Sequence, residues 1–193
     1  AVDATSIVNT GGLTHLYEIL NHYKEKDHPQ IKSIIIIGST KVLDFLPKKK
    51  FYQKKTSFFL NSNKFFRLIY QIFLIDFFLK KNVDILFSLS GDFIGSFKPF
   101  VGMSQNMLLY EKKFWNEIKD FKEKTKLLIN YKRQQICFKK SSGIIFISNY
   151  AKNYISSVLS INEKQISVIH HGLSNRFVFR NNLSKSLNNY SFK

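Results

Sequence analysis

Two patterns of hydrophobic residues alternate along the chain. Short apolar runs rich in Ile, Val and Phe end in Gly, Ser, Asn or His, and their near-continuous apolarity is typical of parallel strands covered on both faces. We expect strands at residues 2–8, 31–37, 83–89, 99–103, 143–147 and 165–169. A further short strand is predicted at residues 57–60.

Between the strands, apolar residues recur at helical spacing, which predicts amphipathic helices. The expected helices cover residues 13–23, 65–79, 110–140 and 149–159. Residues 42–46 predict one helical turn, which Pro47 ends. The segment 65–79 is apolar on almost every side, so we expect it to pack inside the domain, and the segment 110–140 is long enough for two helices.

Strands that alternate with helices over the whole chain predict an α/β fold, a Rossmann-like parallel sheet with helices on both faces and right-handed crossovers. The 193 residues are 44% hydrophobic and 16% aromatic, enough for one domain with its own core and too apolar for a disordered tail. We assign residues 1–179 to this domain. Residues 180–193 are polar and unpatterned, which predicts a linker or a disordered tail.

The chain is strongly basic, with 30 Lys and Arg against 13 Asp and Glu and a formal net charge of +17. Such a surplus attracts polyanions, whether nucleic acid, anionic lipid or nucleotide diphosphates. The alternative is a general bias toward lysine, which would leave the charges on solvated faces. The densest cluster is expected to be a basic loop and comprises Lys48, Lys49, Lys50, Lys54 and Lys55.

Cysteine usage and hydropathy exclude several classes of protein. Cys137 is the only cysteine, so the chain has neither an internal disulfide nor a multi-cysteine metal site, and its helical context indicates a small packed residue. No apolar run reaches the roughly 18 to 20 residues that cross a bilayer. The first residues lack an initiator Met and the pattern of a signal peptide, so we expect a fragment of a longer protein.

In an open parallel sheet, ligands bind outside the carboxyl ends of the strands. The first such place here is Gly11-Gly12, which we expect to form a turn ahead of the first helix. Glycine lets a backbone approach a ligand closely, and the first N–H groups of a helix favour an anion. The alternative is a tight turn that binds nothing. Asn9, Thr10 and His15 flank this place and are second-rank candidates.

Other candidates follow later strands. Ser148 precedes a helix, where it serves either as an ordinary N-cap or as a ligand contact. His170 and His171 are adjacent, so on a strand they point to opposite faces and cannot both enter one site. The chain has no G-x-G-x-x-G fingerprint, P-loop, nucleophile elbow or zinc-ligand spacing, which counts against a dinucleotide oxidoreductase in particular. We expect neither a cofactor nor a metal ion.

Several segments occur in an order and at a spacing that resemble a known family. They are Gly11-Gly12-Leu13, Val83-Asp84-Ile85-Leu86-Phe87, Ser104-Gln105-Asn106-Met107-Leu108, residues 142–152, and Val168-Ile169-His170-His171-Gly172. This succession is similar to the amino-terminal domain of retaining glycosyltransferases of the GT-B fold, the family four or "glycosyl transferases group 1" enzymes. The resemblance covers about residues 2–178.

The resemblance implies an enzyme of two Rossmann-like domains, with the acceptor bound mainly by the first and the sugar nucleotide mainly by the second. It implies that this chain is the acceptor-side half, that the carboxyl-terminal donor-binding domain with its Glu-x7-Glu region is missing, and that the half is inactive alone. No catalytic residue is therefore assigned. The substrate-binding residues that the resemblance suggests are Gly11, Gly12, His15, Gln105, Asn106 and Ser148.

The chain departs from the family at two places. Many members have His or Asp where this chain has Gln105 and Asn106, and members commonly have Glu where it has Asn149. A side-chain amide orients sugar hydroxyls but cannot act as a base. The resemblance therefore carries binding, rather than proton transfer, to this loop.

We therefore expect sugar transfer from a nucleoside-diphosphate sugar to a glycan or lipid-linked acceptor, in the biosynthesis of a surface polysaccharide such as lipopolysaccharide. The family implies a cytoplasmic protein, peripheral at the inner face of the cell membrane, where residues 48–55 and 110–140 would contact anionic lipid. The alternative is a basic nucleic-acid-binding α/β module, which the charge alone allows. No nucleic-acid-binding motif is present, so a nucleic-acid partner is not expected, and a nucleotide-cofactor oxidoreductase ranks third.

Overall fold

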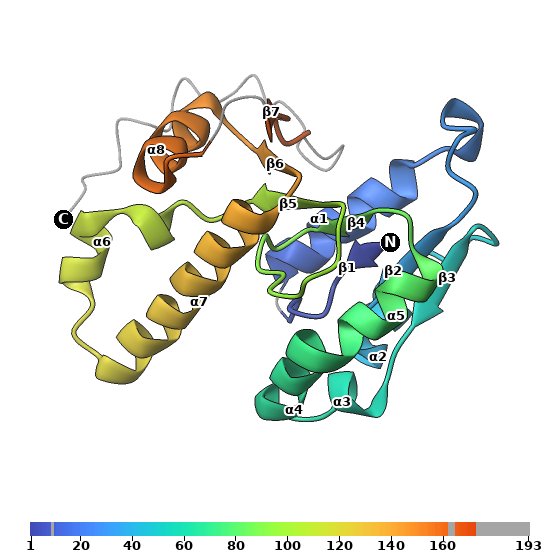
Figure 1. Cartoon of the computed structure of the whole chain (residues 1–193), viewed down its shortest axis with the longest axis horizontal. Coiled ribbons are helices and arrows are strands. Elements are labelled where there is room, and N and C mark those ends of the chain that lie inside the picture. The colour runs from blue at the N-terminus through green and yellow to red at the C-terminus, as the bar shows by residue number, and fades with distance from the viewer. Residues whose placement is uncertain (9, 162–164, 173–193) are drawn as a thin grey trace, which may run out of the picture.

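The structure is a computed structural model that describes residues 1–8, 10–161 and 165–172 (Figure 1). These residues form an α/β fold around one seven-stranded sheet with the strand order β3-β2-β1-β4-β5-β6-β7. Every pair of neighbouring strands is parallel. The predicted Rossmann-like parallel sheet is therefore confirmed. The predicted tail at 180–193 and the candidate Asn9 lie outside the described residues.

The strands are β1 (Val2–Asp3), β2 (Ile34–Ile37), β3 (Tyr52–Lys55), β4 (Leu86–Ser88), β5 (Phe100–Ser104), β6 (Gly143–Phe146) and β7 (Ile166–Val168). The α-helices are α1 (Thr10–His22), α2 (Thr40–Phe45), α3 (Phe58–Asn61), α4 (Lys64–Ile69), α5 (Ile75–Asn82), α6 (Lys112–Glu117), α7 (Phe121–Lys140) and α8 (Asn149–Leu159). A π-helical segment, η2 (Tyr70–Leu74), joins α4 to α5, and two 3-10 helices are η1 (Glu25–Asp27) and η3 (Leu108–Tyr110).

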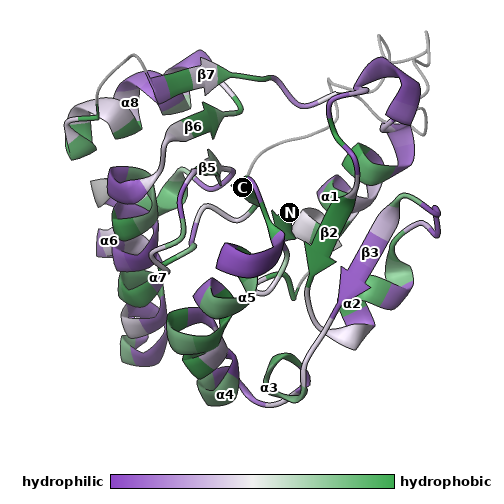
Figure 2. Ribbon diagram, turned by 45° about the vertical axis from the view of Figure 1, so that its right-hand side comes forward, coloured by the Kyte–Doolittle hydropathy of each residue, from purple (hydrophilic) through white to green (hydrophobic). Residues whose placement is uncertain are grey.

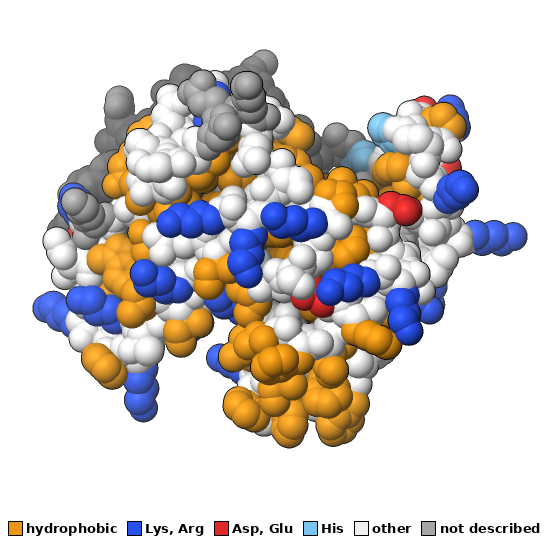
Figure 3. All heavy atoms as spheres, viewed as in Figure 1, with side chains coloured by type: hydrophobic (Ala, Val, Ile, Leu, Met, Phe, Trp, Pro, Cys, Tyr) orange, Lys and Arg blue, Asp and Glu red, His pale blue; other side chains and the backbone are white. Residues whose placement is uncertain are grey.

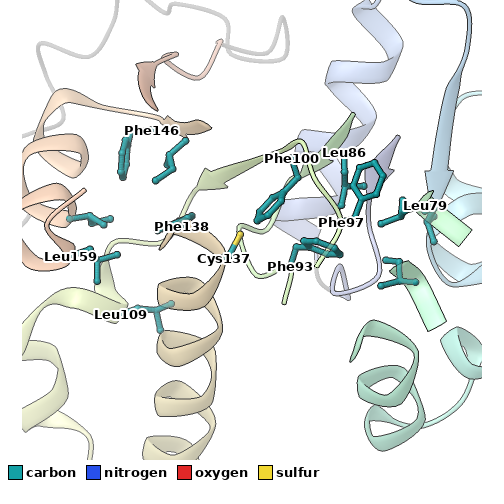
Figure 4. Packing of buried hydrophobic residues seen from close by; sticks show 14 of the residues in the cluster. Leu79, Leu86, Phe93, Phe97, Phe100, Leu109, Cys137, Phe138, Phe146 and Leu159 are labelled. Carbon is teal, nitrogen blue, oxygen red and sulfur yellow. The ribbon is translucent and has the colours of Figure 1, made fainter. Parts of the chain in front are cut away.

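The sheet separates two hydrophobic clusters, because successive residues of a strand face opposite sides. Ile35 and Ile37 of β2 face the side covered by α3, α5, α7 and α8. Ile36, between them, faces the side covered by α1 and α2. Figure 4 shows part of the first cluster, which extends from Leu79 on α5 through Phe138 on α7 to Leu159 on α8. Helices therefore cover both faces, as the sequence predicts.

The start of the fold differs from the prediction. Strand β1 ends after Asp3, because the Asp3 carboxylate accepts hydrogen bonds from the backbone N–H of Thr5 (2.9 Å) and from its hydroxyl (2.6 Å) and turns the chain. Helix α1 then begins at Thr10, so Gly11 and Gly12 lie in its first turn. The predicted glycine turn ahead of the helix is wrong, since packing of α1 in the core outweighs the low helix propensity of glycine.

The edge of the sheet also corrects the prediction. Residues 57–60, expected as a strand, form most of α3, whose start is capped by Ser57 accepting from the backbone N–H of Leu60. The strand is β3 instead, and it includes part of the expected basic loop. Because β3 pairs only with β2, it is an edge strand, where lysines rather than an apolar run are favoured.

The segment 65–79 is helical as predicted, but most of it is not packed inside the domain. Among its residues only Gln71, Ile75 and Leu79 are buried, whereas Phe65 and Phe73 are 67% and 69% exposed. The reason is that one side of α4, η2 and α5 faces the sheet and no described residue covers the other side. Figure 2 shows by colour that the residues of α3 and α4, at one end of the molecule, are largely hydrophobic.

Two further expectations for the chain are confirmed. The segment 110–140 contains two helices, α6 and α7, and Cys137 is buried in α7. Burial raises the pKa of the Cys137 thiol well above its ordinary value, so it stays protonated. None of the helices in the described part of the chain combines the length and the hydropathy that crossing a bilayer requires.

Candidate binding site at the carboxyl edge of the sheet

The carboxyl ends of the parallel strands share one edge of the sheet, and the loops that follow them contact one another there. Gln105, after β5, donates from Nε2 to the carbonyl of Leu89, after β4, at 3.2 Å. His170, after β7, places Nδ1 3.2 Å from the carbonyl of Ile147, after β6. Neighbouring loops are thus linked side by side along the edge where α/β proteins bind ligands.

Helix α1 joins this edge through two histidines. The rings of His15, in the first turns of α1, and His171, after β7, lie edge to face with centroids 4.3 Å apart. Strand β7 lies at one end of the sheet and β1 near its middle, so the loop after β7 returns across the edge to reach α1. The structure therefore brings together the first and the last of the segments that the sequence singled out.

The environment of His15 sets its protonation state. Burial, and secondarily the neighbouring His171, lower the pKa of His15 to about 4. Its ring is therefore neutral at neutral pH, with one donor and one acceptor nitrogen. Its Nδ1 atom is buried and has no hydrogen-bond partner among the described residues. A neutral imidazole in this position is suited to bind an uncharged hydroxyl.

The glycines at the start of α1 leave space. A Cβ atom added at Gly11 would meet nothing within 4 Å, and one added at Gly12 would lie 3.8 Å from the side chain of Ile7. Neither glycine needs a positive φ angle. Gly11 is exposed, and the first N–H groups of a helix favour an anion or a hydroxyl oxygen.

The other candidate residues are engaged close to their own loops. Asn106 is exposed, and its Oδ1 accepts from the backbone N–H of Leu108 at 3.0 Å, at the start of η3. Ser148 caps α8 by accepting from the backbone N–H of Ala151 at 3.1 Å. The N-cap alternative for Ser148 is confirmed. Both residues follow strands that pair with each other, β5 and β6, so they remain at neighbouring positions of the same edge.

Beside α1 the edge contains a small cavity that the sequence did not reveal. It has a volume of about 220 Å³, and its lining residues come from the loop after β1, from Ser39 after β2, and from helices α1, α2, α3 and α4. They are Ile7, Val8, Leu13, Ser39, Lys41, Val42, Asn61 and Arg67. Arg67 donates from Nε to the carbonyl of Leu60 at 2.9 Å, and Asn61 accepts from the backbone N–H of Thr40 at 2.8 Å. The cavity thus combines apolar walls with two cations and two neutral polar groups.

A buried polar network lies at the switch point between β1 and β4, where the strand order reverses. Gln71 of η2 donates from Nε2 to the hydroxyls of Thr5 (2.7 Å) and Ser6 (2.8 Å), after β1. Arg133 of α7 donates to the Gln71 side-chain oxygen at 2.7 Å and forms an ion pair with Asp92 at 3.0 Å. The network fixes the loops after β1 and β4 relative to the two helices that cover them.

Asp3 belongs to the same network through Thr5. Burial, followed by repulsion from Asp92, raises the pKa of Asp3 to about 6, against the opposing effect of its Thr5 hydrogen bonds and of Arg133. The cation nearest to it is committed to Asp92 instead. Asp3, the last residue of β1, therefore changes charge in the mildly acidic range at the carboxyl edge of the sheet.

Simple signals in the sequence point to some of these residues. Ser39 and Lys41 follow β2 just as Gly11 follows β1, so the same strand-end rule finds them. Gln71 is a polar residue inside an apolar helical run, which indicates a specific buried partner. Arg133 and Asp92 give no local signal.

Within the described ranges, no group of three or more His, Cys, Asp or Glu residues is placed to hold a metal ion. Comparison with models of known protein families finds no family that matches the chain. Comparison with curated proteins finds no relative that matches it. The function is therefore argued from the carboxyl edge itself.

Proposed function

We propose that the chain is the acceptor-side domain of a retaining GT-B glycosyltransferase of the group 1 type. In this proposal the enzyme transfers a sugar from a nucleoside-diphosphate sugar to a glycan or lipid-linked acceptor during synthesis of a surface polysaccharide. It works in the cytoplasm at the inner face of the cell membrane. The donor is held mainly by a second α/β domain, which supplies the groups that stabilise the leaving diphosphate.

The observation that carries the proposal is the contact of His15 with His171 at 4.3 Å. It joins the glycine-led start of α1 to the His-His-Gly segment after β7, and both segments belong to the resemblance described above. Segments that are distant in sequence but serve one substrate must meet in space. Segments that resembled the family only by chance would have no reason to lie next to each other in the fold.

The chemistry of the edge fits a hydroxylated acceptor. Neutral His15 and the exposed backbone at Gly11 offer donors and acceptors to sugar hydroxyls. Lys41 and Arg67 line the adjoining cavity and would contact a phosphate of a lipid-linked acceptor. These residues bind and orient the acceptor, and the proposal assigns no proton transfer to Gln105 or Asn106.

Binding of acceptors tests the proposal directly. Saturation-transfer NMR of the chain with a panel of oligosaccharides and short-chain lipid-linked sugars should detect weak binding. The variants Lys41→Ala and His15→Ala should each weaken it by about tenfold, the effect of losing one well-placed polar contact. Lys139→Ala, an exposed residue near the end of α7, is the matched control and should leave binding unchanged. Affinity for oligonucleotides with a steep salt dependence, and none for saccharides, would instead support the nucleic-acid alternative.

A further inference from the structure

A group of exposed hydrophobic side chains lies on α3, α4, η2 and α5. Its principal side chains are Phe58, Phe65, Phe66, Leu68, Ile72, Phe73, Leu74 and Phe77, all of them exposed. In Figure 3 hydrophobic side chains gather over α3 and α4 and form a protrusion at the lower end of the molecule. A soluble domain rarely exposes such a continuous apolar surface without a partner. We refer to these residues as the phenylalanine surface.

The tip of the phenylalanine surface is an ordered row of rings. Phe58 contacts Phe59, Phe59 contacts Phe66, and Phe66 contacts Phe65, with ring centroids 6.2, 6.0 and 5.9 Å apart. Phe58 is nevertheless 76% exposed. The rings therefore hold each other in place while their outer faces remain in solvent, so little side-chain entropy is lost when they bind an apolar partner.

The π-helical segment explains why this side of the helix is apolar. It directs Gln71 inward to Thr5 and Ser6, while Ile72, Phe73 and Leu74 are exposed. Gln71 thus forms hydrogen bonds on the inner side of this segment, and the three apolar residues that follow it are exposed.

The charges next to the phenylalanine surface are positive. Asp76 is the only acidic residue between 56 and 82, and its carboxylate accepts hydrogen bonds from Ser96 (2.6 and 2.7 Å) and from the backbone of Phe97 (3.1 Å), which hold it against the domain. Lys64 begins α4, and the ammonium of Lys81 lies 4.2 Å from the ring centroid of Phe77. A partner that binds the phenylalanine surface therefore contacts both aromatic rings and lysine side chains.

The start of α7 extends the same arrangement. In Figures 1 and 2 the start of α7 and helix α4 reach the same end of the molecule. Phe121, the first residue of α7, is 80% exposed, and the exposed lysines beside it, Lys122, Lys124 and Lys126, outnumber the exposed carboxylates of Asp120 and Glu123. Aromatic side chains surrounded by lysines on a convex surface are the arrangement that binds the interface of an anionic bilayer.

We propose that the phenylalanine surface docks the protein onto an anionic lipid bilayer, with the phenylalanines inserted among the acyl chains and the neighbouring lysines on the headgroups. The convex shape of the surface and its predominantly positive rim favour a bilayer over a second copy of this chain, which would bring mostly like charges together. The basic loop expected from the sequence is not the main contact. Lys49 donates to the carbonyls of Leu20, Asn21 and Tyr23 and is not free to bind lipid.

Co-sedimentation of the full chain with vesicles tests this proposal. Vesicles of phosphatidylcholine mixed with phosphatidylglycerol should bind the protein, and phosphatidylcholine alone should bind it much more weakly. The triple variant Phe58→Ser, Phe65→Ser, Phe73→Ser should lose on the order of tenfold affinity for each ring removed. The matched control replaces exposed apolar residues elsewhere, Tyr150→Ser, Val158→Ser and Ile169→Ser, and should bind as the unaltered chain does.

A second measurement keeps the test independent of folding defects. The variant Phe65→Trp should show a blue-shifted fluorescence maximum with anionic vesicles, relative to the unaltered chain with its single Trp115. Unchanged fluorescence and equal sedimentation of the triple and control variants would overturn the proposal. So would self-association of the chain that the triple variant abolishes without any lipid binding. Because the vesicles contain no sugar acceptor, failure here leaves the proposed glycosyltransferase function standing, and failure of acceptor binding leaves this proposal standing.

Discussion

The His15 ring in α1 contacts the His171 ring beyond β7, with centroids 4.3 Å apart and planes inclined by 75°. This contact connects α1, which follows β1 near the middle of the sheet, to the loop after β7 at one end of it. The residues that sequence reasoning proposed as binding groups lie along this same edge. The following predictions test the structural basis of the site and then the site itself.

The first prediction concerns how stability depends on pH. Folding raises the pKa of Asp3 from 3.8 to about 6, so the folded state binds this proton more tightly and stability falls as pH rises through this range. Folding lowers the pKa of His15 from 6.5 to about 4, so the unfolded chain binds this proton more tightly and stability rises with pH. The two effects oppose each other in the mildly acidic range.

Two substitutions separate these opposing effects. Asp3→Asn removes the Asp3 effect and keeps that of His15, so the free energy of unfolding should increase as pH rises from about 4 to 6.5; the Ala1 amino group, whose pKa burial lowers to about 6, acts in the same direction at the upper end of this range. His15→Gln removes the His15 effect and keeps that of Asp3, so the free energy should decrease as pH rises from about 4 to 6. Urea unfolding over this pH range measures both. Parallel pH profiles for the two variants would contradict the account.

The second prediction concerns Gly91. It has φ of 60°, and a Cβ atom there would collide with the Met103 carbonyl oxygen and lie 2.8 Å from the ring of Phe138. Gly91→Ala should therefore lower the free energy of unfolding by ~2–4 kcal/mol. Gly11→Ala is the matched control, because its Cβ meets nothing and its backbone is helical. It should be neutral or stabilise the fold by ~0.5–1 kcal/mol.

The third prediction concerns the ion pair between Arg133 and Asp92. Both side chains are more than four-fifths buried, so removing Arg133 leaves the Asp92 carboxylate and the Gln71 oxygen without their partner. Arg133→Met should cost about 2–4 kcal/mol of stability. Lys132→Met, on the exposed side of the same turn, should cost less than about 0.5 kcal/mol. A double-mutant cycle with Asp92→Asn should give a coupling free energy of about 1–3 kcal/mol, and a coupling near zero would show that the pair is unimportant.

The fourth prediction separates capping from binding at Ser148. Its hydroxyl accepts from the backbone N–H of Ala151, so Ser148→Ala should cost about 1 kcal/mol of stability. Ser148→Asp keeps the acceptor and adds a favourable charge at the helix start, so it should restore the loss. Thermal unfolding measures both variants. If Ser148→Ala has unchanged stability and loses acceptor binding, then Ser148 contacts the ligand and its capping role is secondary.

The sequence predicts the fold wherever local hydrophobicity decides it. The runs that became β2, β5 and β6 are apolar because they are buried on both faces, and such runs are readable without a structure. Strand β3 escapes this rule because an edge strand needs no apolar run, and Lys54 instead donates to the carbonyls of Leu43 and Leu46. The pattern of apolar residues also cannot distinguish a buried helix from one that exposes half its surface. For this reason the segment 65–79 is helical as predicted but more exposed than predicted.

In the candidate site, too, some residues can be predicted from the sequence and others cannot. The strand-end rule finds Gly11, His15 and Asn106, because it depends only on where strands end. The polar network does not follow from any local pattern, since Arg133 lies 62 residues from its partner Gln71. Its members meet only once α7 and η2 pack on the same face of the sheet. Long-range contacts of this kind need the tertiary structure.

The most direct test of the account is to map where an acceptor saccharide binds by following the amide NMR signals of the labelled chain. We predict that the signals of Gly11, Gly12, His15 and His171 shift together as one saccharide of the panel is added, while those of α8 stay in place. Gly11→Ala, which keeps the fold, should reduce these shifts, because its methyl group enters the open space beside α1. Shifts confined to another face of the molecule would contradict the claim that the carboxyl edge is the sugar-binding groove.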